Sequence, residues 1–226
     1  MQISEATANV LKNFSQINPS IQFKAGQILR TVSPQKTVMA KATIDDTIPS
    51  DGAIYDLNRF MGVLSLFEEP NLVFHTSKVT VEKENRKINY TFADPQMIVT
   101  PPEKEINFPD PEVSVSASWS EMSQVLKAAA VMQLPEIAII GSSGEIHLSA
   151  IDSKNPTADV YSAEIGNTND EFTFIFKVEN LKLLNLSYLI EISAKGIAKF
   201  TSINTEGCKL EYFVATEMNS IFNKGE

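Results

Sequence analysis

The sequence predicts an α+β protein built from a domain that occurs twice. Two amphipathic helix-like segments share the tripeptide Val-Leu-Lys, at Val10–Lys12 and at Val125–Lys127. A series of short alternating strands follows each of them, as expected for hairpin-rich sheets. Between the two copies, five of the chain's 11 prolines fall between Pro95 and Pro111. This proline-rich stretch is typical of a connector between domains.

The chain length agrees with a duplication. The 226 residues divide into halves near the commonest domain size, and each half can bury a modest core. We therefore predict an N-terminal domain over residues 1–100, a connector over residues 101–112 and a C-terminal domain over residues 113–226. The start of the chain lacks the pattern of a secretory signal, and no apolar run is long enough to cross a bilayer. A cytoplasmic protein without a membrane partner is expected.

The first helix of each half has clear end signals. The segment Ser4–Ile17 places Val10, Leu11 and Phe14 on one face and ends at Asn18-Pro19. The segment Ser118–Gln133 begins with Ser118 and Glu121 at the spacing of a capping box, in which the two residues satisfy each other's backbone N–H groups. Both segments are predicted to be amphipathic helices.

A second helix is predicted in each half, over Tyr55–Phe67 and over Phe176–Asn185, because apolar residues recur there at helical spacing. Gly141–Gly144 is predicted to be a hairpin turn, since it precedes a strand and lacks the Lys-Ser/Thr ending of a phosphate-binding loop. Alternating apolar residues predict these strands: Gln27–Val32, Lys36–Ile44, Leu72–Thr76, Lys78–Glu82, Lys87–Ala93, Glu136–Ile140 and Glu145–Ile151.

The sequence offers little catalytic chemistry. His75 and His147 lie in strand-like runs without a second His or Cys at metal-ligand spacing, so we predict no metal site and no cofactor. The one cysteine, Cys208, excludes an internal disulfide and is expected to be a buried apolar side chain. A hydrolase is not expected without a His-assisted nucleophile, and we predict that the protein is not an enzyme.

The charge pattern limits the ways in which the chain can contact nucleic acid. A formal charge of -9 repels a polyanion, so a tight DNA-wrapping protein is not expected. The predicted helices carry slightly more cations than carboxylates, whereas the rest of the chain is strongly acidic. The helix cations are Lys12, Arg59, Lys127, Lys177 and Lys182.

Several sequence segments resemble a known family. Residues 10–14 (Val-Leu-Lys-Asn-Phe) and 53–60 (Ala-Ile-Tyr-Asp-Leu-Asn-Arg-Phe) are similar to segments of the sliding clamps, or DNA polymerase processivity factors, of T-even-like bacteriophages. Ala138-Ile139 and residues 196–200 (Gly-Ile-Ala-Lys-Phe) extend the similarity in the family's order. The resemblance covers most of the chain and is weak through residues 68–93.

The resemblance implies a homotrimeric ring related in shape to proliferating cell nuclear antigen. Two helices per domain would line the hole, on the inner face of antiparallel sheets, and the ring would hold duplex DNA without reading its sequence. Lys12, Arg59, Lys127, Lys177 and Lys182 would then be the residues that face DNA, through contacts to phosphates alone.

The resemblance also implies partner proteins in the cytoplasm of an infected bacterial host. The family docks its DNA polymerase, a clamp-loading ATPase and a late-transcription factor through short hydrophobic C-terminal peptides. A pocket beside the connector would receive them, with apolar residues from the connector and from the last strands. The residues expected there are Met97, Ile98, Val99, Phe213 and Val214. The alternative that all five are ordinary core or strand residues explains their positions equally well.

One alternative remains open from the residues alone. A viral structural or assembly protein made of duplicated β-rich domains would have the same composition. Ring size and retention on circular DNA would distinguish it from a clamp.

Overall fold

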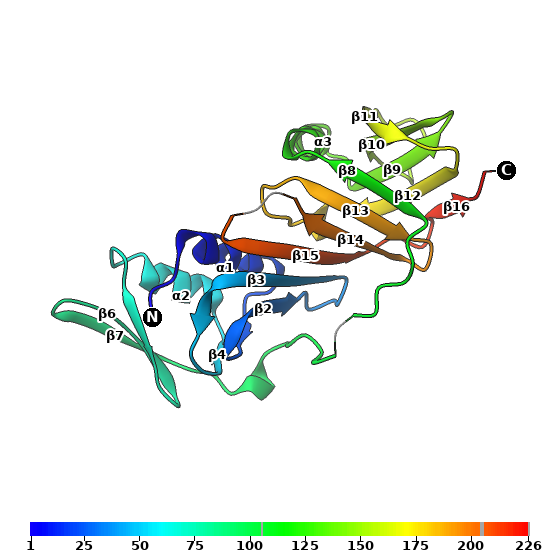
Figure 1. The fold of residues 1–226 in the computed structure, drawn as a ribbon. Coiled ribbons are helices and arrows are strands. Elements are labelled where there is room, and N and C mark those ends of the chain that lie inside the picture. The colour runs from blue at the N-terminus through cyan, green and yellow to red at the C-terminus, as the bar shows by residue number, and fades with distance from the viewer. Residues whose placement is uncertain (105, 204–205, 226) are drawn as a thin grey trace. The chain divides into compact units, whose positions relative to one another are not determined.

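The structure is a computed structural model that describes residues 1–104, 106–203 and 206–225. The described residues form two compact units, and most of their elements are labelled in Figure 1. Unit 1 comprises Met1–Glu105 with Thr205–Glu211, and unit 2 comprises Ile106–Asn204 with Tyr212–Glu226. The strand β15 (Cys208–Ala215) therefore gives its first residues to unit 1 and its last residues to unit 2.

Unit 1 contains two helices that pack on each other. Helix α1 (Glu5–Ile17) contacts helix α2 (Leu57–Leu64) and the antiparallel strands β2 (Gly26–Val32) and β3 (Val38–Ile48). The α1 side chains of Val10, Leu11 and Phe14 are completely buried, which confirms the predicted amphipathic face. The other elements are β1 (Ile21–Phe23), which pairs with β4 (Gly52–Ile54), and a sheet of β5 (Asn71–Phe74), β6 (Lys78–Lys83) and β7 (Arg86–Thr91).

Unit 2 contains one α-helix and two groups of antiparallel strands in its described part. Helix α3 (Trp119–Met132) contacts three strands of a sheet whose order is β11-β10-β9-β12-β16. These strands are β9 (Glu136–Ser142), β10 (Glu145–Ile151), β11 (Tyr161–Asn167), β12 (Glu171–Lys177) and β16 (Ile221–Asn223). The second group has the order β15-β14-β13-β8, with β8 (Val113–Ala117), β13 (Tyr188–Ser193) and β14 (Ile197–Ser202).

The hairpin between β9 and β10 confirms the predicted turn. Ser142 lies opposite Glu145, and the two residues between them, Ser143 and Gly144, have φ of 55° and 93°. Positive φ at both central residues is the geometry of a tight hairpin turn, which glycine adopts without strain. The segment is a tight turn between two paired strands of the sheet.

The prediction of a helix over Phe176–Asn185 is wrong. Strand β12 continues to Lys177, a single 3-10 turn follows at η2 (Val178–Asn180), and the next described residues are irregular. The hydroxyls of two buried tyrosines bond to the backbone of Leu184. The Tyr188 hydroxyl donates to the Leu184 carbonyl oxygen at 2.6 Å, and the Tyr212 hydroxyl accepts from the Leu184 N–H at 3.2 Å. These bonds from tyrosines on β13 and β15 take the place of helical ones, so unit 2 has one described helix where two were expected.

Candidate functional site

The first helices of both units begin with the same hydrogen-bond geometry. At α3, Glu121 Oε2 accepts from the N–H and the hydroxyl of Ser118, both at 2.7 Å, which confirms the predicted capping box. At α1, the N–H and hydroxyl of Ser4 donate instead to Asp46 Oδ2, at 2.8 and 2.7 Å. Asp46 belongs to β3 and lies 42 residues away in sequence. In unit 2 the N–H and hydroxyl of the capping serine therefore bond to a carboxylate within the same helix. In unit 1 they bond to a carboxylate from a strand that is distant in sequence.

Asp46 is ionised at neutral pH. Partial burial raises the pKa of this carboxyl, but the hydrogen bonds from Thr7 and Ser4 outweigh burial and hold the pKa below its ordinary value of 3.8. Because the charged carboxylate also lies at a helix N-terminus, the helix dipole favours it.

Each of these helices carries an exposed stripe with a similar sequence of side-chain types. The α1 stripe consists of Glu5, Asn9, Lys12 and Gln16, and the α3 stripe consists of Ser120, Gln124, Lys127 and Val131. Both follow the spacing of four, three and four residues that aligns side chains along a helix. In each stripe an amide side chain precedes a lysine by three residues. These donors can contact phosphate oxygens without reading base edges.

The fixed orientation of Gln124 depends on neighbouring side chains. Its Nε2 donates to Ser120 Oγ at 3.3 Å, and its Oε1 accepts from the Tyr161 hydroxyl at 3.2 Å. Tyr161 lies on β11, an edge strand of the sheet that α3 covers.

Arg59 is exposed on α2, the helix that packs against α1. The N–H of Arg59 donates to Asp56 Oδ1 at 2.8 Å, which caps the helix. Together with Tyr55 and Tyr90, Arg59 lines a hollow of about 350 Å³. Burial and the nearby carboxylate of Asp56 raise the pKa of Tyr90, so this phenol stays neutral.

The other two predicted cations do not lie on a helix. Lys177 is the last residue of β12, and its Nζ lies 3.9 Å from Glu217 Oε1. Lys182 is exposed in the irregular segment after η2. The structure thus places Lys12, Arg59 and Lys127 on helices, and leaves Lys177 and Lys182 outside them.

The three predicted pocket residues just before the connector are apolar, and two of them are exposed. The side chains of Met97 and Val99 are 70% and 40% exposed, and Ile98 is half-buried. The buried side chain of Asn18, just after α1, donates from Nδ2 to the carbonyl oxygens of Val32 and Val99, at 2.9 and 3.0 Å. This residue ties the connector to the end of the helix.

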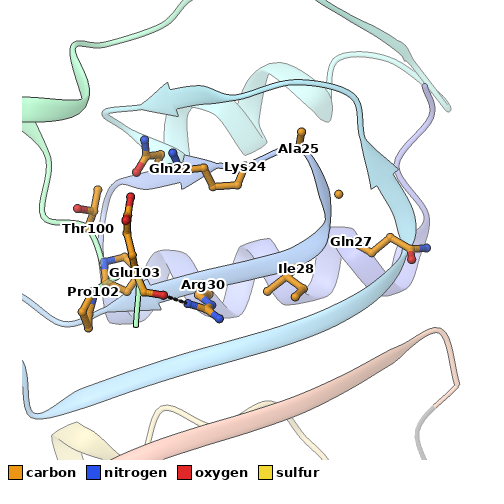
Figure 2. Close-up of a pocket in the computed structure, with 11 residues that line it drawn as sticks. Gln22, Lys24, Ala25, Gln27, Ile28, Arg30, Thr100, Pro102 and Glu103 are labelled. Atoms are coloured by element: carbon orange, nitrogen blue, oxygen red, sulfur yellow. Dashed lines mark hydrogen bonds between the residues drawn. The ribbon is translucent and has the colours of Figure 1, made fainter. Parts of the chain in front are cut away.

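A cavity of about 400 Å³ lies beside the next connector residues. Figure 2 shows Thr100, Pro102 and Glu103 on one side and residues of β1, β2 and their link on the other. Arg30 Nη1 donates to the carbonyl oxygen of Glu103 at 3.2 Å, which holds the connector against β2. Ile28, which is 42% exposed, contributes an apolar side chain.

Phe213 and Val214 point to opposite sides of β15, because neighbouring strand residues alternate. Val214 is completely buried and shares its side with Tyr212 in the core. The ring centroid of Phe213 lies 6.2 Å from that of Phe108, a connector residue in unit 2. The Nζ of Lys199 lies 6.0 Å from the Phe108 ring centroid and 3.5 Å from Glu191 Oε2. Sequence reasoning did not single out Phe108, although an aromatic residue in a proline-rich connector is a usable signal.

The reactive side chains occupy structural positions. His75, one residue past β5, bonds through Nε2 to Thr80 Oγ1 at 3.1 Å, and His147 on β10 lies 3.4 Å from Glu145 Oε2. Cys208 is half-buried rather than fully buried, and burial followed by the charge of Asp45 raises the pKa of its thiol. A raised pKa disfavours the nucleophilic thiolate.

Two further kinds of site are absent from the described residues. No group of three or more His, Cys, Asp or Glu side chains among them is placed to hold a metal ion. None of the helices in this part of the chain has the length and apolar character needed to cross a membrane.

Two family models match the chain. The model described as DNA polymerase processivity factor matches residues 4–100, and the model described as gp45 sliding clamp, C terminal, matches residues 116–218. The chain is 32% identical over 225 residues to the sliding clamp of Vibrio phage KVP40, covering 96% of this chain and 99% of that protein. It is also 32% identical over 227 residues to the sliding clamp of Enterobacteria phage T4, covering 97% and 98% of the two chains.

Solved structures agree on the fold. The structure of A. fulgidus PCNA bound to the C-terminal region of FEN-1 matches with a TM-score of 0.71 at 16% identity, covering 95% of this chain and 96% of that chain. The proliferating cellular nuclear antigen of Entamoeba histolytica matches with a TM-score of 0.69 at 16% identity, covering 93% and 94%. At such identities these matches support the fold alone. The sequence matches go further, and the chain belongs to the phage sliding clamps, the non-catalytic DNA polymerase processivity factors of phage DNA replication.

Proposed function

We propose that three copies of this chain close into a ring around duplex DNA and tether the phage DNA polymerase to it, in the cytoplasm of the infected bacterium. The observation that carries the proposal is the repeated amide and lysine pattern of the α1 and α3 stripes. A helical polyanion inside a ring meets a similar surface at each domain if every domain presents the same stripe. The alternative of a viral structural protein has no support among the matched families.

Unpaired strand edges supply surfaces for ring closure. In the described part of the chain, β7 is bonded only to β6, and β11 only to β10. An exposed edge is a template for pairing with another chain. Joining the β7 edge of one copy to the β11 edge of the next is a head-to-tail contact, which generates a ring when the rotation closes.

The charges of the two edges are complementary. Arg86 and Lys87 are exposed on β7, whereas Glu164 on β11 and Asp159 just before it are exposed and acidic. Opposite charges across an interface steer association and select the correct register.

The proposed DNA contacts are few, which suits sliding. Each phosphate contact that releases a counterion adds affinity and also resists movement along the duplex. Lys12, Arg59 and Lys127 lie on helices and are the main candidates, while Lys177 and Lys182 remain candidates outside the helices. The chain's charge of -9 keeps the remaining surface repulsive to DNA.

Partner proteins, namely the polymerase, a clamp-loading ATPase and a late-transcription factor, are proposed to dock through hydrophobic C-terminal peptides near the connector. In unit 1, the exposed side chains of Met97 and Val99, with Ile98 between them, offer an apolar surface next to the connector residues that line the cavity in Figure 2. In unit 2, Phe213 supplies the apolar residue on β15, whereas Val214 supports it from the core. The A. fulgidus protein of the same fold binds a C-terminal region of its partner, which agrees with this mode.

Charge reversal at the stripes tests the DNA-facing surface. Lys12→Glu combined with Lys127→Glu removes the repeated cation from both helices. We expect loss of polymerase stimulation with the oligomer intact, and a salt dependence of DNA binding whose slope falls by about 0.9 for each phosphate that is no longer neutralised. The matched control reverses Lys154 and Lys195, two exposed lysines in turns of unit 2. Equal stimulation by both double variants would remove the stripes from the DNA-facing surface.

A further inference from the structure

The outer surface of β15 in unit 2 is already occupied by an aromatic side chain. Phe108, in the connector, lies over Phe213 with 6.2 Å between ring centroids and an angle of 56° between ring planes. Phe213 is only 9% exposed, whereas Phe108 is half-buried. This differs from the core pair Tyr188 and Phe200, whose rings are both buried. Phe108 is therefore a cover on the sheet and not a part of its core.

A pair of charged side chains lies beside this cover. The ammonium of Lys199 lies 6.0 Å from the Phe108 ring centroid, within the range of a cation–π contact. Lys199 is itself paired with Glu191 on the neighbouring strand at 3.5 Å. The patch under Phe108 thus combines an aromatic floor with a charged rim, which is the composition of a pocket for one aromatic or large aliphatic side chain.

The connector backbone restricts how far Phe108 can move. Glu112 is bonded to β13, with its N–H donating to the Ile192 carbonyl oxygen at 3.0 Å and its Oε2 accepting from the Ala194 N–H at 2.7 Å. Pro109 and Pro111 lie between Phe108 and this anchor, and they fix the backbone in extended conformations. Phe108 consequently lies four residues before this anchor, on a short extended stretch that belongs to no strand of the sheet.

We propose that Phe108 is a built-in occupant of the partner-peptide site, which the hydrophobic anchor residue of a docking peptide must displace. This inference rests on the peptide docking proposed above, and it specifies the anchor as an aromatic or large aliphatic side chain that contacts Phe213. Only molecules in which the patch is uncovered can bind the peptide, so the apparent affinity for the peptide equals the intrinsic affinity multiplied by the uncovered fraction. An aromatic pair of this kind corresponds to a factor of about two to ten.

The test measures binding of a fluorescent peptide that copies the C-terminus of the same phage's DNA polymerase to the full-length protein. Phe108→Ala is expected to tighten binding about two- to tenfold, because the patch is then open. Phe213→Ala is expected to weaken binding, because the anchor loses its floor. Asn107→Ala, a change at the neighbouring exposed connector residue, is the matched control and is expected to leave affinity unchanged.

A second measurement follows Phe108 directly. With 4-fluorophenylalanine at position 108, saturating peptide is expected to shift the fluorine resonance to the position seen in the Phe213→Ala variant.

The possible results distinguish the occupant role from peptide docking itself. If Phe213→Ala weakens binding but Phe108→Ala also weakens it or leaves it unchanged, Phe108 is a wall of the pocket or a packing residue, and the occupant role is wrong. A fluorine resonance that does not respond to peptide has the same meaning. If the wild-type protein does not bind the peptide, or if Phe213→Ala has no effect on binding, docking at this site is itself wrong and the occupant role falls with it.

Discussion

At the scale of single residues, the two helix N-caps show that different side chains can produce the same local geometry. Glu121 lies three residues after Ser118, so the sequence spacing predicts its role in a capping box. Asp46 does the same for Ser4 from a strand 42 residues away, and no sequence spacing indicates a contact of that kind. The sequence therefore predicts the bond between Ser118 and Glu121 but not the bond between Ser4 and Asp46.

Asp46→Ala is predicted to destabilise unit 1 by about 1 kcal/mol, the typical cost of losing a helix cap. The pKa of Asp46 is lowered in the folded protein, so its stabilisation is present above the ordinary value of 3.8 and is lost as pH falls through the lower folded value. Urea unfolding should therefore separate wild type and variant at pH 7 and bring them together in strong acid. The control, Asp45→Ala at the exposed neighbouring position, should unfold like wild type at pH 7. A gap that persists below the folded pKa contradicts this account.

Strand alternation also decides which predicted pocket residues can act together. The sequence predicts Phe213 and Val214 together as apolar pocket residues on the last strand, but adjacent strand residues face opposite sides, and Val214 is completely buried. The partner that the structure supplies for Phe213 is Phe108, from a connector whose path the sequence does not define.

At the scale of elements, periodicity predicted the helices that have clear end signals and failed where a short apolar pattern had none. Helices α1 and α3 begin with a serine cap, and α2 begins with Asp56. The segment after β12 has no side-chain cap at Lys177. Its Leu184 N–H and carbonyl oxygen hydrogen-bond instead to the hydroxyls of Tyr212 and Tyr188. A helix of so few residues is only marginally stable, so these hydrogen bonds outweigh the helical spacing of the leucines.

Tyr212→Phe removes the hydroxyl that accepts from the Leu184 N–H, and it should cost about 1 kcal/mol because a part-buried N–H is left without this acceptor. The same change at Tyr161, whose hydroxyl bonds to the exposed Gln124, should have a much smaller effect. Thermal unfolding of the two variants makes the comparison. Equal destabilisation by both changes would show that the tyrosine bonds do not hold this segment.

The edge strands lead to a prediction about assembly. Reversing Arg86 and Lys87 to Glu should weaken the proposed contact between β7 and the β11 edge of the next copy, shifting light-scattering mass towards the monomer. Adding Asp159→Lys and Glu164→Lys in the same chain should restore the assembly, because each copy supplies both edges. The β11 changes alone are the control and should weaken it as the β7 changes do. Failure of the combined variant to recover would place the subunit contact elsewhere.

At the scale of the whole molecule, the sequence predicted the duplicated α+β architecture because the helix caps and strand periods are local signals that recur in both halves. It did not predict that unit 2 has one described helix, so the proposed inner wall would not repeat identically at every domain. The two units share the stripes on α1 and α3. The stripes differ in charge only at their first residue, which is Glu5 in α1 and the uncharged Ser120 in α3.

The charge distribution favours capture by enclosure over capture by affinity. The described helices carry Lys12, Arg59 and Lys127 against Glu5 and Glu121, while the chain as a whole has a charge of -9. Such a surface holds DNA weakly in open solution, and weaker still as salt rises. If the protein closes into the proposed ring, its retention depends on whether the DNA has an end.

The most direct test measures that dependence. The protein is placed on nicked circular DNA by the same phage's clamp-loading ATPase, chemically crosslinked between subunits, and separated from free protein by gel filtration at high salt. We predict that the crosslinked protein stays with the circle and leaves it once a restriction enzyme opens the DNA. Equal release from circular and linear DNA would contradict the proposal that this clamp encircles the duplex.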